Sequence, residues 1–151
     1  MSQHILTITL PLPFRMGSVN CYLIQTSAGQ SLIDTGAPNA LNQLLRALEA
    51  AGCRPGTLGL VILTHGDFDH IGNARRLRTL YGASLAMHRN DAGMAERGDM
   101  FVNRKRPNVL VRTLIPLFTG FRASQRFTPD VLLDPGYDLS PYGLAADVIS
   151  L

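Results

Sequence analysis

The sequence has no tryptophan, and aromatic residues of all kinds make up only 7% of its 151 residues. Proteins that bind single-stranded nucleic acid stack the bases on aromatic side chains, so this scarcity counts against such a function. Charged residues make up 17%, and a net charge of +3 falls short of a nucleic-acid-binding surface. We therefore expect a small-molecule substrate, with an anionic one permitted, and no nucleic acid.

Long apolar runs and cysteine motifs are also missing. No run approaches the roughly 20 residues that cross a bilayer, and the first twenty residues lack a charged segment followed by a long apolar core. We therefore expect no membrane span, no secretory signal and a cytoplasmic protein. The two cysteines, Cys21 and Cys53, lie far apart and outside any metal or redox spacing, which favours reduced residues in the core.

Apolar residues make up 46% of the chain, and a chain of this length buries about two thirds of its unfolded surface, which suffices for one domain. Strand patterns alternate with helix patterns over the first half, which predicts an α/β fold with helical crossovers. The expected strands are 5–12, 19–25, 31–36, 60–64 and 84–88. The expected helices are 38–51 and a second from about residue 70 to 81. Near the C-terminus we expect the start of a strand at 145–151.

A cluster of potential metal ligands follows the apolar run that ends at Thr64. Four side chains able to bind a metal lie within six positions: His65, Asp67, Asp69 and His70. Imidazoles and carboxylates each offer a lone pair to a divalent ion. Residues i and i+2 of an extended segment project the same way, so His65 and Asp67 suit one ion, and Asp69 and His70 suit a second. A polar loop with one helix-capping Asp is the alternative, but capping explains only one of the four residues.

This spacing resembles the His-x-His-x-Asp-His signature of the metallo-β-lactamase superfamily, including its glyoxalase II-like hydrolases. The resemblance extends to Thr64 in front and to Gly72-Asn73 behind, and to the early strand around residues 20–24. It fails at one position, because Asp67 stands where the family has its second His. The resemblance implies zinc, with two ions in the complete domain. A carboxylate hardens the ligand set, so iron or manganese are the alternatives.

The fold that the resemblance implies is an αββα sandwich. Residues 1–151 would form the N-terminal part of one such domain, namely its first βα half plus an insertion. Three further metal ligands of the family belong to the second half, so each ion would have only two ligands from this chain. We therefore expect the missing C-terminal half, or a partner chain, to complete the site, and little activity from the segment alone.

The resemblance also implies a reaction. A metal-activated hydroxide would attack an acyl bond in a thioester, lactone or related ester or amide, and Asp69 would be the catalytic residue that passes a proton to the leaving group. One alternative is a diiron redox protein that resembles the flavodiiron branch, which Asp67 favours. Another is a non-catalytic half-domain that needs a partner chain, which the missing ligands favour.

Two residues outside the cluster are further candidates. Asp34, in an Asp-Thr-Gly turn that also resembles the family, is predicted to support the metal site by accepting the free N–H of a ligating histidine. Capping of the next helix explains Asp34 equally well. His88, at a strand end, either lines the site or packs as an ordinary histidine.

Residues 90–126 contain both apolar and basic residues, and the alternation of strand and helix patterns does not continue through them. This stretch resembles the insertions through which superfamily members vary their substrate preference, and we predict a substrate lid. Arg104 and Arg106 are its candidates for binding a carboxylate or phosphate of the substrate. A membrane-surface helix or an oligomer contact is the rival interpretation, which leaves a homo-oligomer open.

Overall fold

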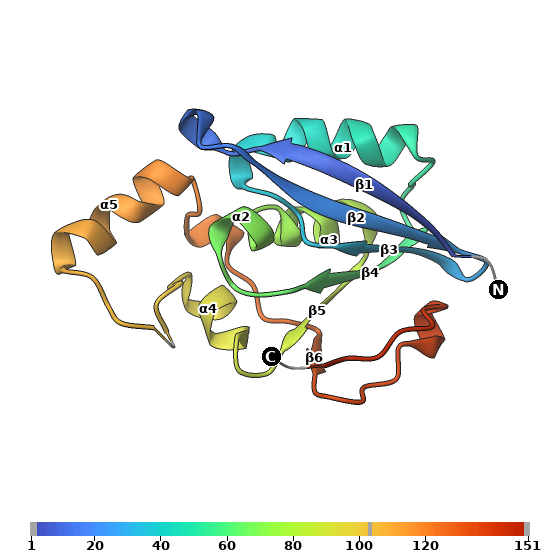
Figure 1. Cartoon of the computed structure of the whole chain (residues 1–151). Helices are drawn as coiled ribbons and strands as arrows, with labels where there is room; N and C mark the ends of the chain where they lie inside the picture. Colours follow the sequence, from blue (N-terminus) through green and yellow to red (C-terminus); the bar gives the residue numbers. More distant parts are fainter. Residues whose placement is uncertain (1–2, 103, 150–151) are drawn as a thin grey trace.

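The computed structural model describes residues 3–102 and 104–149, and within them six strands form one mixed sheet in the order β1-β2-β3-β4-β5-β6 (Figure 1). The first three strands are antiparallel neighbours: β1 (His4–Pro11), β2 (Ser18–Thr26) and β3 (Gly29–Ile33). The sheet continues in parallel from β3 through β4 (Leu58–Leu63), β5 (Ser84–His88) and β6 (Val131–Leu133).

Helices make the connections between the parallel strands. The 3-10 turn η2 (Pro38–Ala40) and α1 (Leu41–Ala50) join β3 to β4, and α2 (Phe68–Ile71) and α3 (Ala74–Tyr81) join β4 to β5. Parallel strands need such crossovers, so the predicted α/β arrangement is confirmed. Between β5 and β6 lie α4 (Ala92–Arg97), α5 (Val109–Thr119) and η3 (Ala123–Gln125), while η1 (Pro13–Arg15) and η4 (Ser140–Tyr142) complete the described elements.

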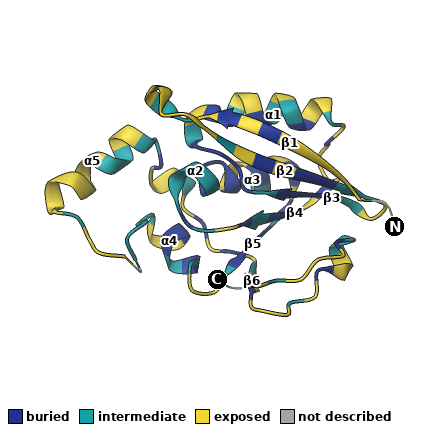
Figure 2. Cartoon of the chain, in the orientation of Figure 1, coloured by how far each residue is buried: buried dark blue, intermediate teal, exposed yellow. Residues whose placement is uncertain are grey.

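The two faces of the sheet are covered differently. One face packs against α1 and α3, and its fully buried side chains include Leu23, Leu32 and Leu85 from the strands and Leu48 and Leu77 from the helices. Alternate residues point to the opposite face, where Ile24, Leu60, Ala86 and Leu133 pack against Leu139 and Leu144 of the last segment. Figure 2 shows buried residues concentrated in the strands, whereas α5 is largely exposed.

Several predicted boundaries shift for identifiable reasons. The strand expected at 31–36 ends at Ile33, because Asp34 has φ 59°, a left-handed conformation that turns the chain out of the extended state. The helix expected from about residue 70 is divided into α2 and α3. At the division, the Asn73 side chain donates hydrogen bonds to the carbonyls of Thr35 and Ala37, and its backbone N–H donates to Thr35 Oγ1.

The strand expected at 145–151 is wrong for the described residues 145–149, which are irregular. A backbone hydrogen bond joins the Gly136 N–H to the Val148 carbonyl at 3.1 Å, and Val148 packs against the apolar cluster on that face. A single such bond makes no strand ladder. Residues 150–151 of that prediction lie outside the described part.

The cysteine prediction is confirmed. Cys21 and Cys53 are free and buried. Burial raises the pKa of Cys21 to about 12 and that of Cys53 to about 11, so both thiols are neutral at physiological pH.

Candidate metal site at the end of β4

The site is built where two neighbouring parallel strands end. Asp34 directly follows β3 and Thr64 directly follows β4, and the Asp34 N–H extends the pairing by donating to the Ile62 carbonyl at 2.9 Å. Carboxyl ends of parallel strands meet at one edge of the sheet, which is where open α/β sheets bind ligands. The loop from Thr64 to Asp67 then leads into α2 at Phe68.

The Asp34 carboxylate connects the end of β4 to α2 through hydrogen bonds. The Asp34 side chain is only 7% exposed, and its carboxylate accepts hydrogen bonds from the Thr64 N–H at 2.9 Å, the Thr64 Oγ1 at 2.8 Å and the His70 Nδ1 at 2.8 Å. The helix-capping explanation is wrong, because Ala37 precedes η2 and Ala40 precedes α1 at the N-cap positions. The geometry agrees with a supporting role toward His70.

The hydrogen bonds assign the proton positions on both histidines. A carboxylate only accepts, so the His70 Nδ1 carries the proton that bonds to Asp34. The Thr64 hydroxyl donates its one proton to Asp34, so it accepts at 3.0 Å from the Nδ1–H of His65. The Nε2 of each imidazole therefore faces a carboxylate, and it carries a free lone pair when the imidazole is neutral and a proton when it is charged. The hydrogen bonds that join Thr64 to Asp34 and His65 were not predicted. The position of Thr64 at the end of the strand, just before His65, could have indicated them.

The four predicted ligands lie together. His65 Nε2 is 3.4 Å from Asp67 Oδ2, and His70 Nε2 is 3.5 Å from Asp69 Oδ2. The two imidazole ring centroids are 4.0 Å apart. The donors thus face one another as two His-Asp pairs. Within residues 3–102 and 104–149, no group of three or more His, Cys, Asp or Glu is arranged to hold an ion.

The charges around the pairs suit a cation. Three carboxylates, those of Asp34, Asp67 and Asp69, face one guanidinium, that of Arg104, whose Nη1 lies 2.8 Å from Asp67 Oδ1. Burial acts to raise the pKa of Asp67, but the hydrogen bond with His65 and the charge of Arg104 outweigh it and hold that pKa below its usual value. For His70, burial acts to lower the pKa, but the hydrogen bond and charge of Asp34 prevail and raise it.

Arg104 and Arg106 occupy different positions. Arg104 bonds to a predicted metal ligand, 37 residues away in sequence, a pairing that the sequence did not indicate. Arg106 is exposed, and its side chain makes no hydrogen bond or ion pair within the described part of the chain. Substrate binding by either residue stays a prediction.

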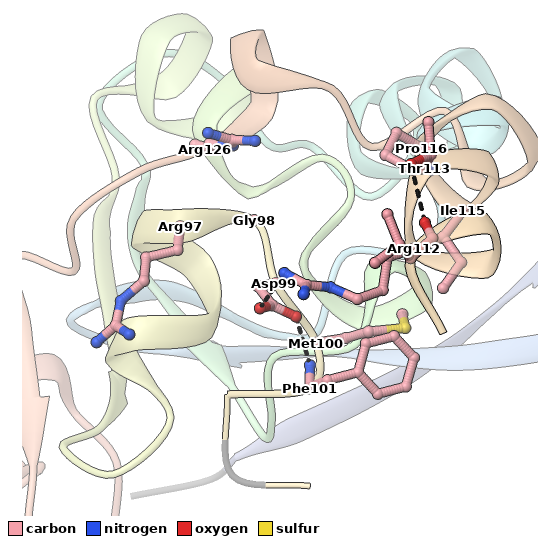
Figure 3. A pocket seen from close by; sticks show the side chains of 11 residues that line it. Arg97, Gly98, Asp99, Met100, Phe101, Arg112, Thr113, Ile115, Pro116 and Arg126 are labelled. Carbon is pink, nitrogen blue, oxygen red and sulfur yellow. Dashed lines mark hydrogen bonds and ion pairs between the residues drawn. The ribbon is translucent and has the colours of Figure 1, made fainter. Parts of the chain in front are cut away.

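A hollow of about 370 Å³ separates α4 from α5 (Figure 3). Arg97, Arg112 and Arg126 lie on its lining, and all three are exposed. The Arg112 guanidinium turns toward Asp99, at 3.6 Å, whereas the Arg97 and Arg126 side chains point in other directions. These three arginines therefore do not converge on one point.

His88 belongs to another cavity. It shares with Thr64, Asn90 and Asp91 the lining of a space of about 540 Å³ on the sheet face opposite α1 and α3. Its Nδ1 accepts the Asn90 N–H at 3.2 Å. Whether His88 serves the site stays a prediction.

Comparison with known proteins gives the family. A sequence model described as the metallo-beta-lactamase superfamily matches residues 15–141. The human metallo-beta-lactamase domain-containing protein 1 is 44% identical over 61 residues, which are 40% of this chain and 23% of that protein. The uncharacterized protein YobT of Bacillus subtilis is 26% identical over 110 residues, which are 73% of this chain and 46% of that protein.

Solved structures show the same fold. A metallo-beta-lactamase HARLDQ-motif mutant from Cronobacter sakazakii has a TM-score of 0.65 and 21% identity, covering 91% of this chain and 49% of that chain. BJP-1, a subclass B3 metallo-beta-lactamase of Bradyrhizobium japonicum, has a TM-score of 0.56 and 22% identity, covering 79% of this chain and 40% of that chain. The chain thus spans less than half the length of each of these relatives, and it belongs to the metallo-β-lactamase superfamily.

Proposed function

We propose that the protein is a metal-dependent hydrolase of an acyl bond, in a thioester, lactone or related ester or amide. The observation that carries the proposal is the hydrogen-bonded chain through Asp34 and Thr64, which leaves the Nε2 atoms of His65 and His70 facing carboxylates, where a metal ion can replace the Nε2 proton. Membership of the superfamily, which generally means metal-dependent hydrolysis, supports it.

The residues fit divalent ions by their chemistry. His65 and Asp67 would hold one ion, and Asp69 and His70 a second, with zinc as the first choice and iron or manganese favoured by the extra carboxylate. A catalytic zinc ordinarily has three protein ligands, so the C-terminal half or a partner chain would add the rest. When bound, such ions acidify water and stabilise the negative charge that develops on the acyl oxygen.

Three residues of the site have distinct roles in the proposed reaction. Asp34 holds His70 in orientation, as supporting carboxylates do for ligating histidines. Asp69, beside His70 Nε2, would take a proton from the attacking water and deliver it to the leaving group. Arg104 neutralises part of the charge of Asp67. A small-molecule substrate and a cytoplasmic location belong to the same proposal.

A non-catalytic half-domain is the second candidate. It is favoured by the finding that, among the described residues, no three His, Cys, Asp or Glu side chains are arranged to hold one metal ion. A diiron redox protein, the third candidate, rests on the carboxylate of Asp67 alone.

The test uses the full gene product that contains this chain. After loading with zinc, iron or manganese, metal content is measured by mass spectrometry, and hydrolysis is measured on a panel of thioesters, lactones and esters. We expect Asp69→Asn to lower kcat/KM at least about 100-fold. The matched control is Asp138→Asn, because Asp138 is exposed and bonds only to nearby Ser140, and it should leave kcat/KM unchanged.

Three outcomes would overturn the hydrolase proposal. A metal-loaded protein inactive on the whole panel would favour the half-domain. Two iron atoms per chain with redox activity would favour the diiron protein. Equal kcat/KM for Asp69→Asn and the wild type would remove Asp69 from the reaction.

A further inference from the structure

The outer face of α5 is apolar and uncovered. Leu110, Leu114, Leu117 and Phe118 recur at i, i+4, i+7 and i+8, which places them on one side of the helix. Leu110, Leu117 and Phe118 are 68%, 68% and 58% exposed, and α5 contains no buried residue. The stripe that ordinarily packs against a core is therefore exposed, and Figure 2 colours α5 largely as exposed.

The other side of α5 faces the rest of the protein. Ile115, Pro116 and Thr119 line a small hollow together with Gly66 and Phe68, which belong to the metal-site loop and α2. This side of the helix therefore faces the loop after β4 and α2. The outward direction of the apolar stripe follows from this arrangement.

A second segment extends the same surface. Phe14 and Met16, in the turn between β1 and β2, are 71% and 58% exposed. The rings of Phe14 and Phe118 meet edge to face with centroids 6.0 Å apart. Phe14 and Arg15 have φ 56° and 57°, a conformation that is uncommon for bulky residues and that tends to mark functional positions.

The stretch of sequence that contains α5 carries charges of one sign, although Arg104 and Arg112 pair with Asp67 and Asp99 outside it. Residues 100–129 contain no Asp or Glu. The basic residues of that stretch are Arg104, Lys105, Arg106, Arg112, Arg122 and Arg126. Arg15 adds another exposed cation next to Phe14. A second copy of the chain would present the same cations and be repelled, whereas an anionic lipid surface attracts them.

We propose that Phe14, Met16, Leu110, Leu117 and Phe118, here called the apolar surface, dock onto an anionic phospholipid bilayer. The apolar side chains enter the boundary between headgroups and acyl chains, and the neighbouring basic residues bind the headgroups, as in other interfacial helices. No helix of the described residues is long and apolar enough to cross a membrane. The docking is independent of the proposed hydrolysis.

The test is co-sedimentation of the full gene product with vesicles of phosphatidylcholine, with and without phosphatidylglycerol. We expect binding only with phosphatidylglycerol, weakening as salt is added. The double variant Leu117→Ser with Phe118→Ser should abolish sedimentation. Lys105→Ala with Arg106→Ala should weaken binding about 25-fold, since each cation near an anionic leaflet contributes about a fivefold gain.

Matched controls come from the rest of the surface. Ile5→Ser removes an apolar side chain that is 59% exposed on β1, and Arg46→Ala with Arg76→Ala removes two exposed cations from α1 and α3. Both should bind vesicles like the wild type, with unchanged circular dichroism in every variant. The proposal is overturned if the wild type ignores anionic vesicles, if the controls lose binding equally, or if light scattering shows a dimer that the Leu117 and Phe118 substitutions dissociate while vesicle binding persists.

Discussion

One carboxylate, that of Asp34, organises the metal-site loop. It accepts three hydrogen bonds, from Thr64 twice and from His70 once, while almost completely buried. An unsatisfied buried donor loses its full hydration. The side chain of Asp34 therefore contributes to the stability of the fold as well as to the orientation of the histidine.

Replacing that carboxylate should be costly. We expect Asp34→Ala to lower the free energy of unfolding by about 2–4 kcal/mol, because it removes the charged hydrogen bonds from Thr64 and His70 and puts alanine at a left-handed position. Asp138→Ala, at an exposed position with local bonds, should change it by less than about 1 kcal/mol. Urea unfolding followed by circular dichroism measures both, and equal midpoints would contradict the role assigned to Asp34.

At the same scale, the grouping of the candidate ligands could be predicted because they lie within six positions of one another. His65, Asp67, Asp69 and His70 are carried by one loop and the helix that follows, so local spacing brings them together. The pairing of Arg104 with Asp67 could not be predicted, because it spans 37 residues and depends on where the insertion folds back.

Among the elements, the junction of α2 and α3 is closely packed against the turn after β3. Gly72 has no room for a Cβ, which would lie 2.5 Å from Pro38 Cδ and 2.6 Å from the carbonyl oxygens of Gly36 and Phe68. The backbone of the Asp34–Gly36 turn therefore approaches the helices closely. That approach lets Asp34 reach His70.

A pair of glycine substitutions tests this packing. We expect Gly72→Ala to destabilise the protein by roughly 2–3 kcal/mol or more, since two of the clashing atoms are backbone oxygens that cannot rotate away. Gly59→Ala on β4 meets nothing within 4 Å and should be neutral or stabilising by up to about 1 kcal/mol. Thermal unfolding compares the two, and a Gly72→Ala variant as stable as the wild type would refute the close approach.

For the whole molecule, stability is unevenly distributed. Strands β2, β3 and β4 lie inside the sheet, with Leu23, Leu32 and Val61 completely buried. Helix α5 buries no side chain. Local opening requires little free energy where few apolar contacts are broken.

Hydrogen exchange should reveal this difference. Amides of β3 and β4 should exchange slowest and those of α5 fastest, as measured by mass spectrometry of peptic peptides from the full gene product. Anionic vesicles should then slow exchange in α5 without changing β4, because docking covers only the apolar surface. Fast exchange in β4, or strong protection of α5 without vesicles, would contradict this description.

The sequence by itself determined the α/β alternation and the contiguous donor cluster, because hydrophobic periodicity and local spacing act within single elements. Only the tertiary structure decided which strand ends meet, that Asp34 bonds to Thr64 and His70 instead of capping a helix, and that Arg104 reaches Asp67. It also decided that the apolar stripe of α5 faces outward. These features depend on contacts between segments far apart in the chain, whose geometry is fixed only when the sheet and its helices pack together.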